Sequence, residues 1–542
     1  MTEPQTHDAD HLIARYQRAK DRRSHWEGHW QECYEFALPQ REGAITGSTP
    51  GEKKGTRLFD ATASDAVDQL SASLLSELTP PWSKWFAFKP GKDAPEDAHH
   101  GMTEALERAA KILQGHFDRS NFAVEMHQCY LDLVTAGTAC LMFEEAPIGE
   151  ASAFRFTAVP LSNVVFEESI GGQLDATFRR SELTTQQFNE RFPDGAIRTE
   201  NDFQDVTMND EKIIVIEAVV PSAKGYDYVA VRDADALENG ARAVLKTGSY
   251  RTSPFINFRW LKAPGEVYGR SPVMKALPDI KTANKVVELI LKNAAIAVTG
   301  IWQADDDGVL NPATIRLEPG TIIPKAVGSA GLTPLKPAND MNLSNIVLDQ
   351  MRERIRHAMM VDMLGQPNKP NMSATEVIER SMDMARLLGK TYGRLQSELL
   401  TPLALRAVTI LQRRGEIAKF EIDGRVIELD YTSPLARHRA QREAAQMAEW
   451  VTKVNLLGPQ ALQLLDPVKA ARHLASVYGV PADLLRNPEE LEIGDPSAQT
   501  LDPTQPDFLS AITDAFGEMA SGAPGDATVP TSPIVGDDHG PA

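Results

Sequence analysis

The sequence predicts an α+β fold, and three observations support that prediction. Apolar residues recur three and four positions apart over long stretches on either side of the chain's middle, which is typical of amphipathic helices. Between residues 154 and 260 the pattern changes to short alternating runs separated by Gly, Pro, Asn and Asp, which is typical of antiparallel strands. Two further long helical stretches then enclose a segment dense in Gly and Pro.

Composition and charge set the outer bounds. With 542 residues, 42% hydrophobic and 24% charged, the chain is an ordinary globular mixture that is long enough for several cores. The residues after Arg486 contain 11 acids and no Lys or Arg, so the total charge of −19 leaves −8 for the rest of the chain. A mildly acidic body disfavours tight wrapping of nucleic acid, because wrapping needs basic surface that releases counterions.

The cysteines and the N-terminus predict where the protein is found. Cys33, Cys129 and Cys140 form no CxxC pair and are odd in number, which favours buried free thiols in a reduced compartment. The first residues lack the basic-then-apolar order of a signal peptide, and the most apolar run is broken by Glu288 and Lys292. We therefore expect a soluble protein that is cytosolic where it is made and has no membrane partner.

The first part of the chain is predicted to be helical. Residues 11–37 carry an apolar stripe that ends before Pro39. Asp60 or Ser64 is expected to cap a second helix, and Thr103 to open a third. A fourth helix opens at Asn121, ends at Gly137 and leads into a strand. Four aromatic residues after the second helix are predicted to be core: Trp82, Trp85, Phe86 and Phe88. Within the β region, one helix is expected near residues 184–192.

Residues 266–298 predict the first of two long helices. Ser271 can cap it and Pro272 suits its first position, while Pro278 and Asp279 are expected to restart it. Its apolar stripe consists of Ile280, Ala283, Val287, Ile290, Ala294 and Ala297. Its other face carries Lys281, Lys285 and Lys292.

Residues 299–340 predict a small irregular excursion. Asp305, Asp306 and Asp307 lack the spacing of a calcium loop, so we interpret them as a solvated turn. A second long helix begins near Asn342, and it completes an antiparallel hairpin with the first. The apolar stripe of the second helix consists of Leu343, Val347, Met351, Ile355 and Met359.

The rest of the chain returns to helix after a short loop. Residues 365–372 (GQPNKPNM) contain two prolines, and the capping box from Ser373 to Glu376 starts a helix that we expect to kink at Pro402 and end at Gly415. Residues 420–431 predict a hairpin with Asp-Gly at its turn. Helices are expected in residues 433–488, and residues 489–542 are expected to be a disordered acidic tail.

No catalytic pattern stands out. The stretch around Lys54 superficially resembles a phosphate loop, but the lysine precedes Gly55 and no strand comes before it. GxSxG, HExxH, zinc-ligand and dinucleotide patterns are missing from the sequence as well. We therefore predict no enzyme activity and no cofactor.

Three motifs carry a resemblance to a known family. YGRSP, ALPDIKTAN and SATEV occur in this order and spacing within residues 268–377. In this respect the chain resembles the head-to-tail connector (portal) proteins of short-tailed bacteriophages, over most of residues 10–480. The resemblance implies a wing (1–265, and 373–432 as a long kinked helix with a hairpin), stem helices (266–298 and 341–364), a clip (299–340), a channel loop (365–372) and a helical crown (433–488).

The same resemblance implies a function without chemistry of its own. About twelve copies would form a ring at one capsid vertex. That ring would be the channel for double-stranded DNA, which the terminase large subunit packages and which is later ejected. Major capsid and scaffolding proteins and tail adaptors would be further partners, in the virion and, during assembly, in the host cytoplasm. Two alternatives stay open: another phage structural protein, such as a capsid or tail-tube component, and, with less support, a DNA-acting motor or nuclease.

Two sets of candidate site residues follow. The first set would face DNA in the channel and consists of Lys281, Lys285, Lys292, Asn368, Lys369 and Asn371. For the three stem lysines, pairing with acids of a neighbouring subunit is an equal alternative. The second set would dock terminase and the tail through the clip and consists of Trp302, Asp305, Asp306 and Asp307.

Overall fold

The structure is a computed structural model. It describes residues 9–43, 51–81, 83–93, 99–193, 212–232, 244–299, 302–304, 326–328, 332–334, 341–361, 391–420 and 426–432, with isolated residues beside them and short helical pieces between 446 and 475. The chain divides into two units, of which the first comprises Met1–Asn368 and Arg380–Arg439. The second comprises Lys369–Glu379 and Ala440–Ala542. The elements below belong to the first unit.

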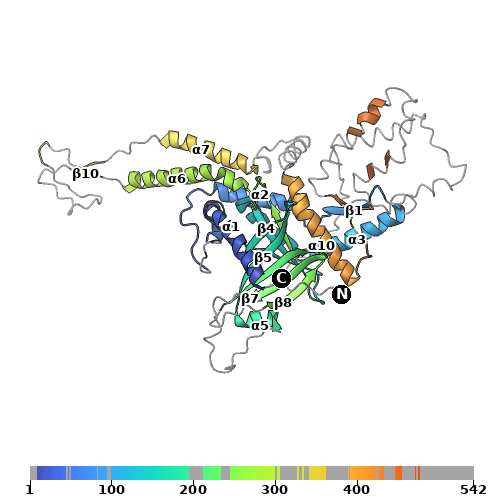
Figure 1. Ribbon diagram of the computed structural model, residues 1–542. Coiled ribbons are helices and arrows are strands. Elements are labelled where there is room, and N and C mark those ends of the chain that lie inside the picture. Colours follow the sequence, from blue (N-terminus) through green and yellow to red (C-terminus); the bar gives the residue numbers. More distant parts are fainter. Residues whose placement is uncertain are drawn as a thin grey trace, which may run out of the picture. The chain divides into compact units, whose positions relative to one another are not determined.

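Four helices open the chain, close to where the sequence predicts them (Figure 1). They are α1 (Ala9–Ala37), α2 (Thr62–Leu78), α3 (His99–Arg119) and α4 (Phe122–Ala136). Asp60 accepts a hydrogen bond from the Thr62 amide at the start of α2. Gly137 ends α4 with φ of 79°, a left-handed conformation that favours glycine. Helix α3 begins four residues before the predicted Thr103, since the sequence from His99 continues the same helix.

Two antiparallel sheets follow, as the alternating pattern predicts. The three-stranded sheet has the order β3 (Phe154–Val159), β2 (Thr138–Glu145), β9 (Phe255–Arg259). The five-stranded sheet runs in chain order through β4 (Val164–Glu168), β5 (Leu174–Leu183), β6 (Ile213–Ser222), β7 (Gly225–Arg232) and β8 (Val244–Tyr250). The predicted helix within this region is α5 (Thr185–Arg191), which Thr184 and Gln187 start with a capping box. Short 3-10 turns, η1 (Pro39–Arg41) and η3 (Leu161–Asn163), complete the connections.

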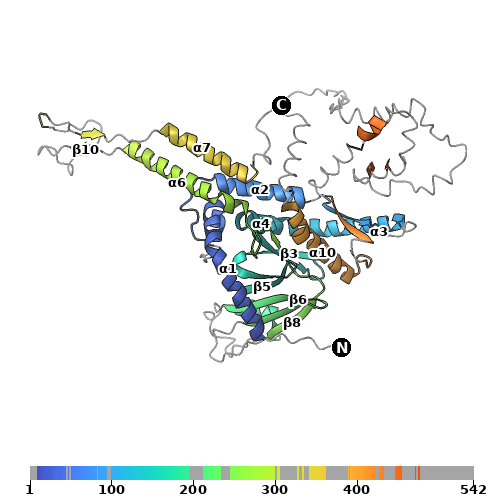
Figure 2. The ribbon, with the colours of Figure 1, turned by 45° about the horizontal axis from the view of Figure 1, so that its top comes forward.

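Two of the three buried apolar clusters of the described residues hold these layers together. Leu12, Ile13 and Tyr16 of α1 pack against the five-stranded sheet, which α1 crosses in both ribbon views (Figure 2). The larger cluster joins α1 to α4, the three-stranded sheet and the later helices. Trp85, Phe86 and Phe88 are buried there, as predicted for the aromatic cluster, whereas Trp82 lies outside the described residues. The three cysteines are buried and unpaired, as predicted.

Two long helices form the predicted hairpin. Helix α6 (Pro272–Thr299) and α7 (Met341–Ala358) lie side by side in both views (Figures 1 and 2). Arg354, late in α7, pairs with Asp279, early in α6, at 2.9 Å, which makes the pair antiparallel. A two-stranded ladder of β10 (Trp302–Ala304) and β11 (Leu332–Pro334) lies between them in sequence.

The structure corrects three expectations about this hairpin. Helix α6 runs through Pro278 without restarting, because the Ile280 and Ala283 side chains that follow are already buried in the core. In the predicted stripe of α7, Ile355 and Met359 are buried as expected, but Val347 is 36% exposed and its neighbour Leu348, at 5%, is buried instead. Helix α7 also ends at Ala358, before the predicted residue 364. Met360, two residues after this end, adopts φ of 59°.

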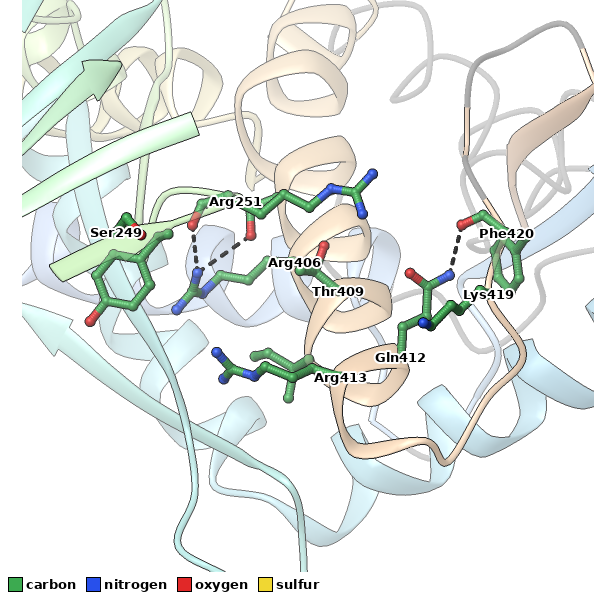
Figure 3. Close-up of a pocket in the computed structure, with 11 residues that line it drawn as sticks. Ser249, Arg251, Arg406, Thr409, Gln412, Arg413, Lys419 and Phe420 are labelled. Carbon is green, nitrogen blue, oxygen red and sulfur yellow. Dashed lines mark hydrogen bonds between the residues drawn. The ribbon is translucent and has the colours of Figure 1, made fainter. Parts of the chain in front are cut away.

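The last elements lie far apart in sequence from their partners. The helix continues past Pro402, as predicted, from a π-helical turn, η6 (Gln396–Leu400), into α10 (Thr401–Arg414), which Gly415 ends as predicted. The kink at Pro402 stays a prediction. Strand β12 (Ile427–Tyr431) pairs with β1 (Phe86–Pro90), and Phe420 and Ile422 lie in no strand, which corrects the predicted hairpin. Helix α10 also borders a pocket next to the chain between β8 and β9 (Figure 3).

Several predictions fall on residues outside those described. They concern Asp305, Asp306 and Asp307, the loop 365–372 with the capping box after it, most of the helices in 433–488, and the acidic tail. They remain predictions.

Candidate functional site

The α6/α7 hairpin is the candidate functional site, and the YGRSP motif forms its base. Tyr268 is 1% exposed, and its ring lies 5.0 Å from that of Trp30 and 5.7 Å from that of Phe166. The Ser271 hydroxyl accepts a hydrogen bond from the Met274 amide at 2.9 Å, which is the predicted cap of α6. The same hydroxyl donates to the Thr135 carbonyl of α4, also at 2.9 Å. The motif therefore starts the helix and ties its first turn to α4.

Two glycines allow this close approach. Gly137, after α4, and Gly269, in the motif, have their backbones in contact, and a Cβ on either would overlap the carbonyl of the other. The Gly269 amide donates to the Thr138 hydroxyl at 2.8 Å, and the Trp260 amide donates to the Gly137 carbonyl at 2.9 Å. Both positions therefore require glycine, because a side chain at either would overlap the other backbone. At Gly137 the left-handed backbone conformation also favours glycine.

A buried polar cluster ties both helices of the hairpin to the segment before α2. The Asn284 side-chain oxygen accepts from the amides of Phe59 at 2.6 Å and Asp60 at 3.1 Å. The Asn284 amide nitrogen donates to the Arg57 carbonyl at 2.8 Å. From α7, Arg352 pairs with the Asp60 carboxylate at 2.8 Å. We call these residues the base clamp.

The sequence analysis did not predict the base clamp, although one feature of the sequence indicated it. Asn284 follows Ile280 by four positions, so it is a polar residue on the apolar stripe of a helix. A buried amide at such a place must satisfy its hydrogen bonds within the protein. Its partners at Arg57, Phe59 and Asp60 lie more than 220 residues earlier in the chain, and local pattern does not reach them.

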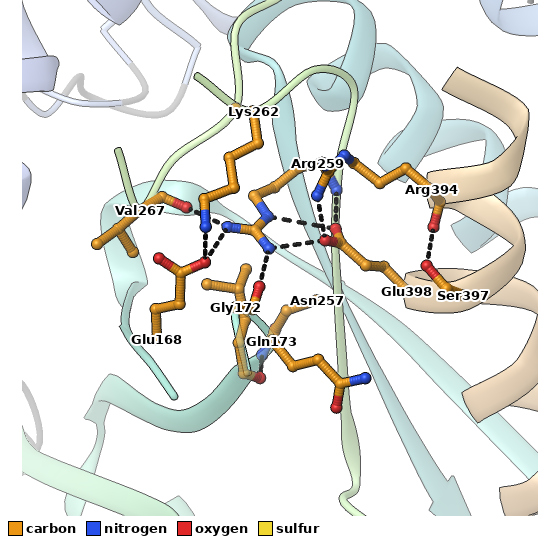
Figure 4. Close-up of polar contacts among 12 residues, drawn as sticks. Glu168, Gly172, Gln173, Asn257, Arg259, Lys262, Val267, Arg394, Ser397 and Glu398 are labelled. Carbon is orange, nitrogen blue, oxygen red and sulfur yellow. Dashed lines mark hydrogen bonds and ion pairs between the residues drawn. The ribbon is translucent and has the colours of Figure 1, made fainter. Parts of the chain in front are cut away.

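A second polar network surrounds Arg259, which is fully buried at the end of β9 (Figure 4). Its guanidinium donates to Glu398 at 2.7 Å, Glu168 at 3.2 Å, and the carbonyls of Val267 at 2.9 Å and Gly172 at 2.7 Å. Glu398 lies in the π-helical turn η6 and also accepts from Arg394 at 2.8 Å. The network therefore joins β9, the chain leading into α6 and η6 through one side chain.

The three predicted stem lysines lie on α6, and each is paired within the same chain. Lys281 contacts Glu32 of α1 at 3.1 Å. Lys285 and Lys292 both contact Glu288, at 2.9 Å and 2.6 Å. These hydrogen bonds hold the pKa of Glu288 below its ordinary value. With Glu32 and Glu288 beside them, the three lysines leave one net positive charge on this face.

The remaining predicted site residues are only partly placed. Trp302 belongs to β10, whose partner strand is β11. Asp305, Asp306, Asp307, Asn368, Lys369 and Asn371 lie outside the described residues. Among the residues that the structure describes, no group of three or more His, Cys, Asp or Glu could hold a metal ion. The described helices include none long and apolar enough to cross a membrane.

Large apolar side chains remain exposed on the hairpin. Leu289 and Leu291 of α6 are 49% and 52% exposed, and Ile346 of α7 is 57% exposed. At the base of the same helices Ile280 and Ile355 are 2% and 1% exposed. The hairpin thus becomes less well covered by its own chain with distance from the base clamp, which is typical of a surface that packs against another molecule.

Comparisons with known proteins agree on one family. The family model described as "Bacteriophage head to tail connecting protein" matches residues 9–485. The "Probable portal protein" of Bordetella phage BPP-1 is 24% identical over 500 residues, which is 88% of each chain. The "Portal protein" of Salmonella phage epsilon15 is 23% identical over 565 residues, covering 94% of this chain and 99% of that one.

A solved structure is similar over a comparable length. It is a chain from the neck of a native gene transfer agent particle, computed with C12 symmetry, with 15% identity and a TM-score of 0.34 over 78% of this chain and 91% of that one. A TM-score this low does not establish a common fold.

Proposed function

Since this chain belongs to the bacteriophage head to tail connecting proteins, and its function is therefore that of a portal, we propose that the α6/α7 hairpin is where copies of the chain pack side by side into a ring. The observation that carries this proposal is the exposure of Leu289, Leu291 and Ile346 along the hairpin. Side-by-side packing of one hairpin against the next would bury them, and a repeated heterologous contact of this kind closes into a ring.

The domain division is kept within this proposal, except that the second stem helix ends at Ala358. Residues 1–265 and 373–432 would be the wing, 266–298 and 341–358 the stem helices, 299–340 the clip, 365–372 the channel loop and 433–488 the crown. Elements α6 and α7 support the stem, and the short ladder of β10 with β11 supports a small clip between them. The ring would have about twelve subunits.

The partners follow from the portal role. Double-stranded DNA would pass through the ring without sequence-specific contact. Terminase, capsid and scaffolding proteins would bind during assembly in the host cytoplasm, and tail adaptors would bind in the virion. No cofactor or catalytic step is needed, because the ring acts as a channel and an attachment point.

Electron microscopy of the purified protein tests the ring directly. We expect particles with an axial hole and a sedimentation coefficient far above that of a 59.5 kDa monomer. A protein that stays monomeric under packaging-like conditions would contradict the ring.

A double variant tests the hairpin as the contact. Leu289→Asp with Leu291→Asp places two charges where the ring would bury leucines, so we expect the subunit to fold and the ring to dissociate. Ile148→Asp with Ile170→Asp is the matched control, because both isoleucines are fully exposed and lie outside the hairpin. Equal ring formation by the two double variants would exclude the hairpin as the main contact.

A further inference from the structure

A basic pocket lies away from the hairpin, between the end of β8 and helix α10 (Figure 3). Its volume is about 450 Å³. Four of its lining residues are cationic and none is acidic; the cations are Arg251, Arg406, Arg413 and Lys419. In a chain whose formal charge is −19, such a pocket is unlike the average surface.

Arg406 is the buried cation of this pocket. Its side chain is 5% exposed and lies against the rings of Tyr250 at 5.3 Å and Phe143 at 5.7 Å. Nε donates to the Phe143 carbonyl at 2.6 Å, and Nη1 donates to the Thr252 carbonyl at 2.7 Å. Nη2 makes no hydrogen bond with any residue that the structure describes.

The charge of Arg406 is not neutralised by an ion pair. Among the described residues no carboxylate lies within ion-pair distance of its guanidinium, and Glu144 acts on it only at longer range. Burial lowers the pKa of Arg406 to about 10. A buried cation that lacks a counter-charge is costly, and an anion that enters the pocket would offset that cost.

The other cations line the same pocket. Arg413 is 62% exposed and pairs with Glu145, and Lys419 is exposed with no partner among the described residues. Ser249 and Thr252 also line the pocket, as does Thr409, whose hydroxyl donates to the Leu405 carbonyl at 2.8 Å. A phosphate group has several acceptor oxygens, and guanidinium groups bind them through paired N–H donors. Several cations and hydroxyls fit a phosphate better than a single carboxylate.

We propose that this pocket binds a phosphate-class oxyanion, with the free Nη2 of the buried Arg406 as one donor and with the exposed side chains of Arg413 and Lys419 as further cations. The phosphate could belong to a small molecule or to a nucleic-acid backbone, since the recognising groups are the same.

Binding of inorganic phosphate to the full-length protein tests the pocket, at constant ionic strength maintained with chloride. We expect saturable binding by isothermal titration calorimetry. Arg413→Gln with Lys419→Gln should weaken it about tenfold, which is about 1.4 kcal/mol, because two of the cations are removed while the buried packing of Arg406 is kept. Lys20→Gln with Arg22→Gln on the exposed face of α1 removes the same charge elsewhere and should leave binding unchanged.

A second arm uses a short fluorescent duplex DNA and identifies the source of the phosphate. If a nucleic-acid backbone is bound, the pocket variant should weaken duplex binding and inorganic phosphate should compete with it. If only small phosphates are bound, the pocket variant should weaken binding of inorganic phosphate and leave duplex binding unchanged. Failure to saturate in both arms, or an equal loss in the α1 control, would overturn the proposal.

Discussion

At the scale of single residues, the hairpin depends on a few buried polar side chains. Asn284 satisfies two amides and one carbonyl of the segment before α2, all from one side chain. Asn284→Ala would leave these groups buried without partners, and we expect it to lower the free energy of unfolding by about 1–3 kcal/mol in urea denaturation. Thr282→Ala, two positions away on the exposed face of α6, should change it by less than about 0.5 kcal/mol. Equal losses would show that the base clamp adds nothing to stability.

Arg259 allows a sharper comparison, because Glu398 joins a buried and a partly exposed arginine. Glu398→Ala leaves the fully buried Arg259 short of a partner, so we expect a loss of about 3–5 kcal/mol. Arg394→Ala removes the other partner of Glu398. Because the Arg394 side chain is 31% exposed, we expect this variant to lower the free energy of unfolding by less than about 1 kcal/mol. Thermal denaturation of both variants measures the difference, and a larger loss for Arg394→Ala would contradict this ranking.

Asp60 gives the base clamp a dependence on pH. Burial acts to raise the pKa of Asp60, but hydrogen bonds from Thr62 and Arg352 outweigh it and hold the pKa below the ordinary 3.8. A carboxyl with a lowered folded pKa contributes stability above its unfolded pKa and loses it as the pH falls through the folded value.

The difference in unfolding free energy between the wild-type protein and Asp60→Asn should therefore be constant above roughly pH 5 and shrink at lower pH. Urea denaturation at several pH values measures it. A difference that stays constant through the acid range would mean that Arg352 does not depend on the charge of Asp60.

At the scale of elements, local signals predicted most helix ends. As predicted, α6 is capped by Ser271, and α4 and α10 end at Gly137 and Gly415. Such caps and left-handed glycines depend on a few neighbouring residues, so the local sequence predicts them. Pro278 misled the prediction, since burial of the following turns outweighs the hydrogen bond that proline removes. The pairing of β12 with β1 joins Tyr431 to Phe86, and no local turn signal reports a contact of that range.

The candidate site shows the same division. The stem lysines were predicted on one face of a long helix, and they lie on α6. Their partner Glu288 is within one helical turn of two of them and could have been predicted from i,i+3 and i,i+4 spacing. Glu32, the partner of Lys281, lies on another helix 249 residues away, so only tertiary structure reveals it.

Charge reversal at the stem tests what this face does. We expect Lys285→Glu with Lys292→Glu to leave the subunit folded, because both side chains are exposed and surface pairs contribute little. If the lysines face DNA, rings should form normally while the salt dependence of packaging changes. Weaker rings with unchanged packaging per ring would instead assign the lysines to contacts between subunits. Lys20→Glu with Arg22→Glu on α1 is the matched control.

At the scale of the whole molecule, charge is divided unevenly along the chain. Residues 489–542 contribute 11 of the acids and no Lys or Arg, so a chain ending at Pro488 would carry −8 instead of −19. Because a segment of this composition offers little apolar surface for burial, we expect this truncation to leave the melting temperature and ring formation unchanged. Differential scanning calorimetry and electron microscopy measure both. Loss of soluble protein would show that the segment supports the fold.

The contact between Gly137 and Gly269 has a mechanical consequence. Helix α6 has 28 residues and so extends about 40 Å at 1.5 Å per residue. The glycine contact lies next to the first turn of this helix, at the fixed end of the hairpin. A contact between side chains can adjust under load by a change of rotamer, whereas two touching backbones have no such freedom. We therefore expect a load on the far end of the hairpin to be passed through the Gly137–Gly269 contact into α4 and β2.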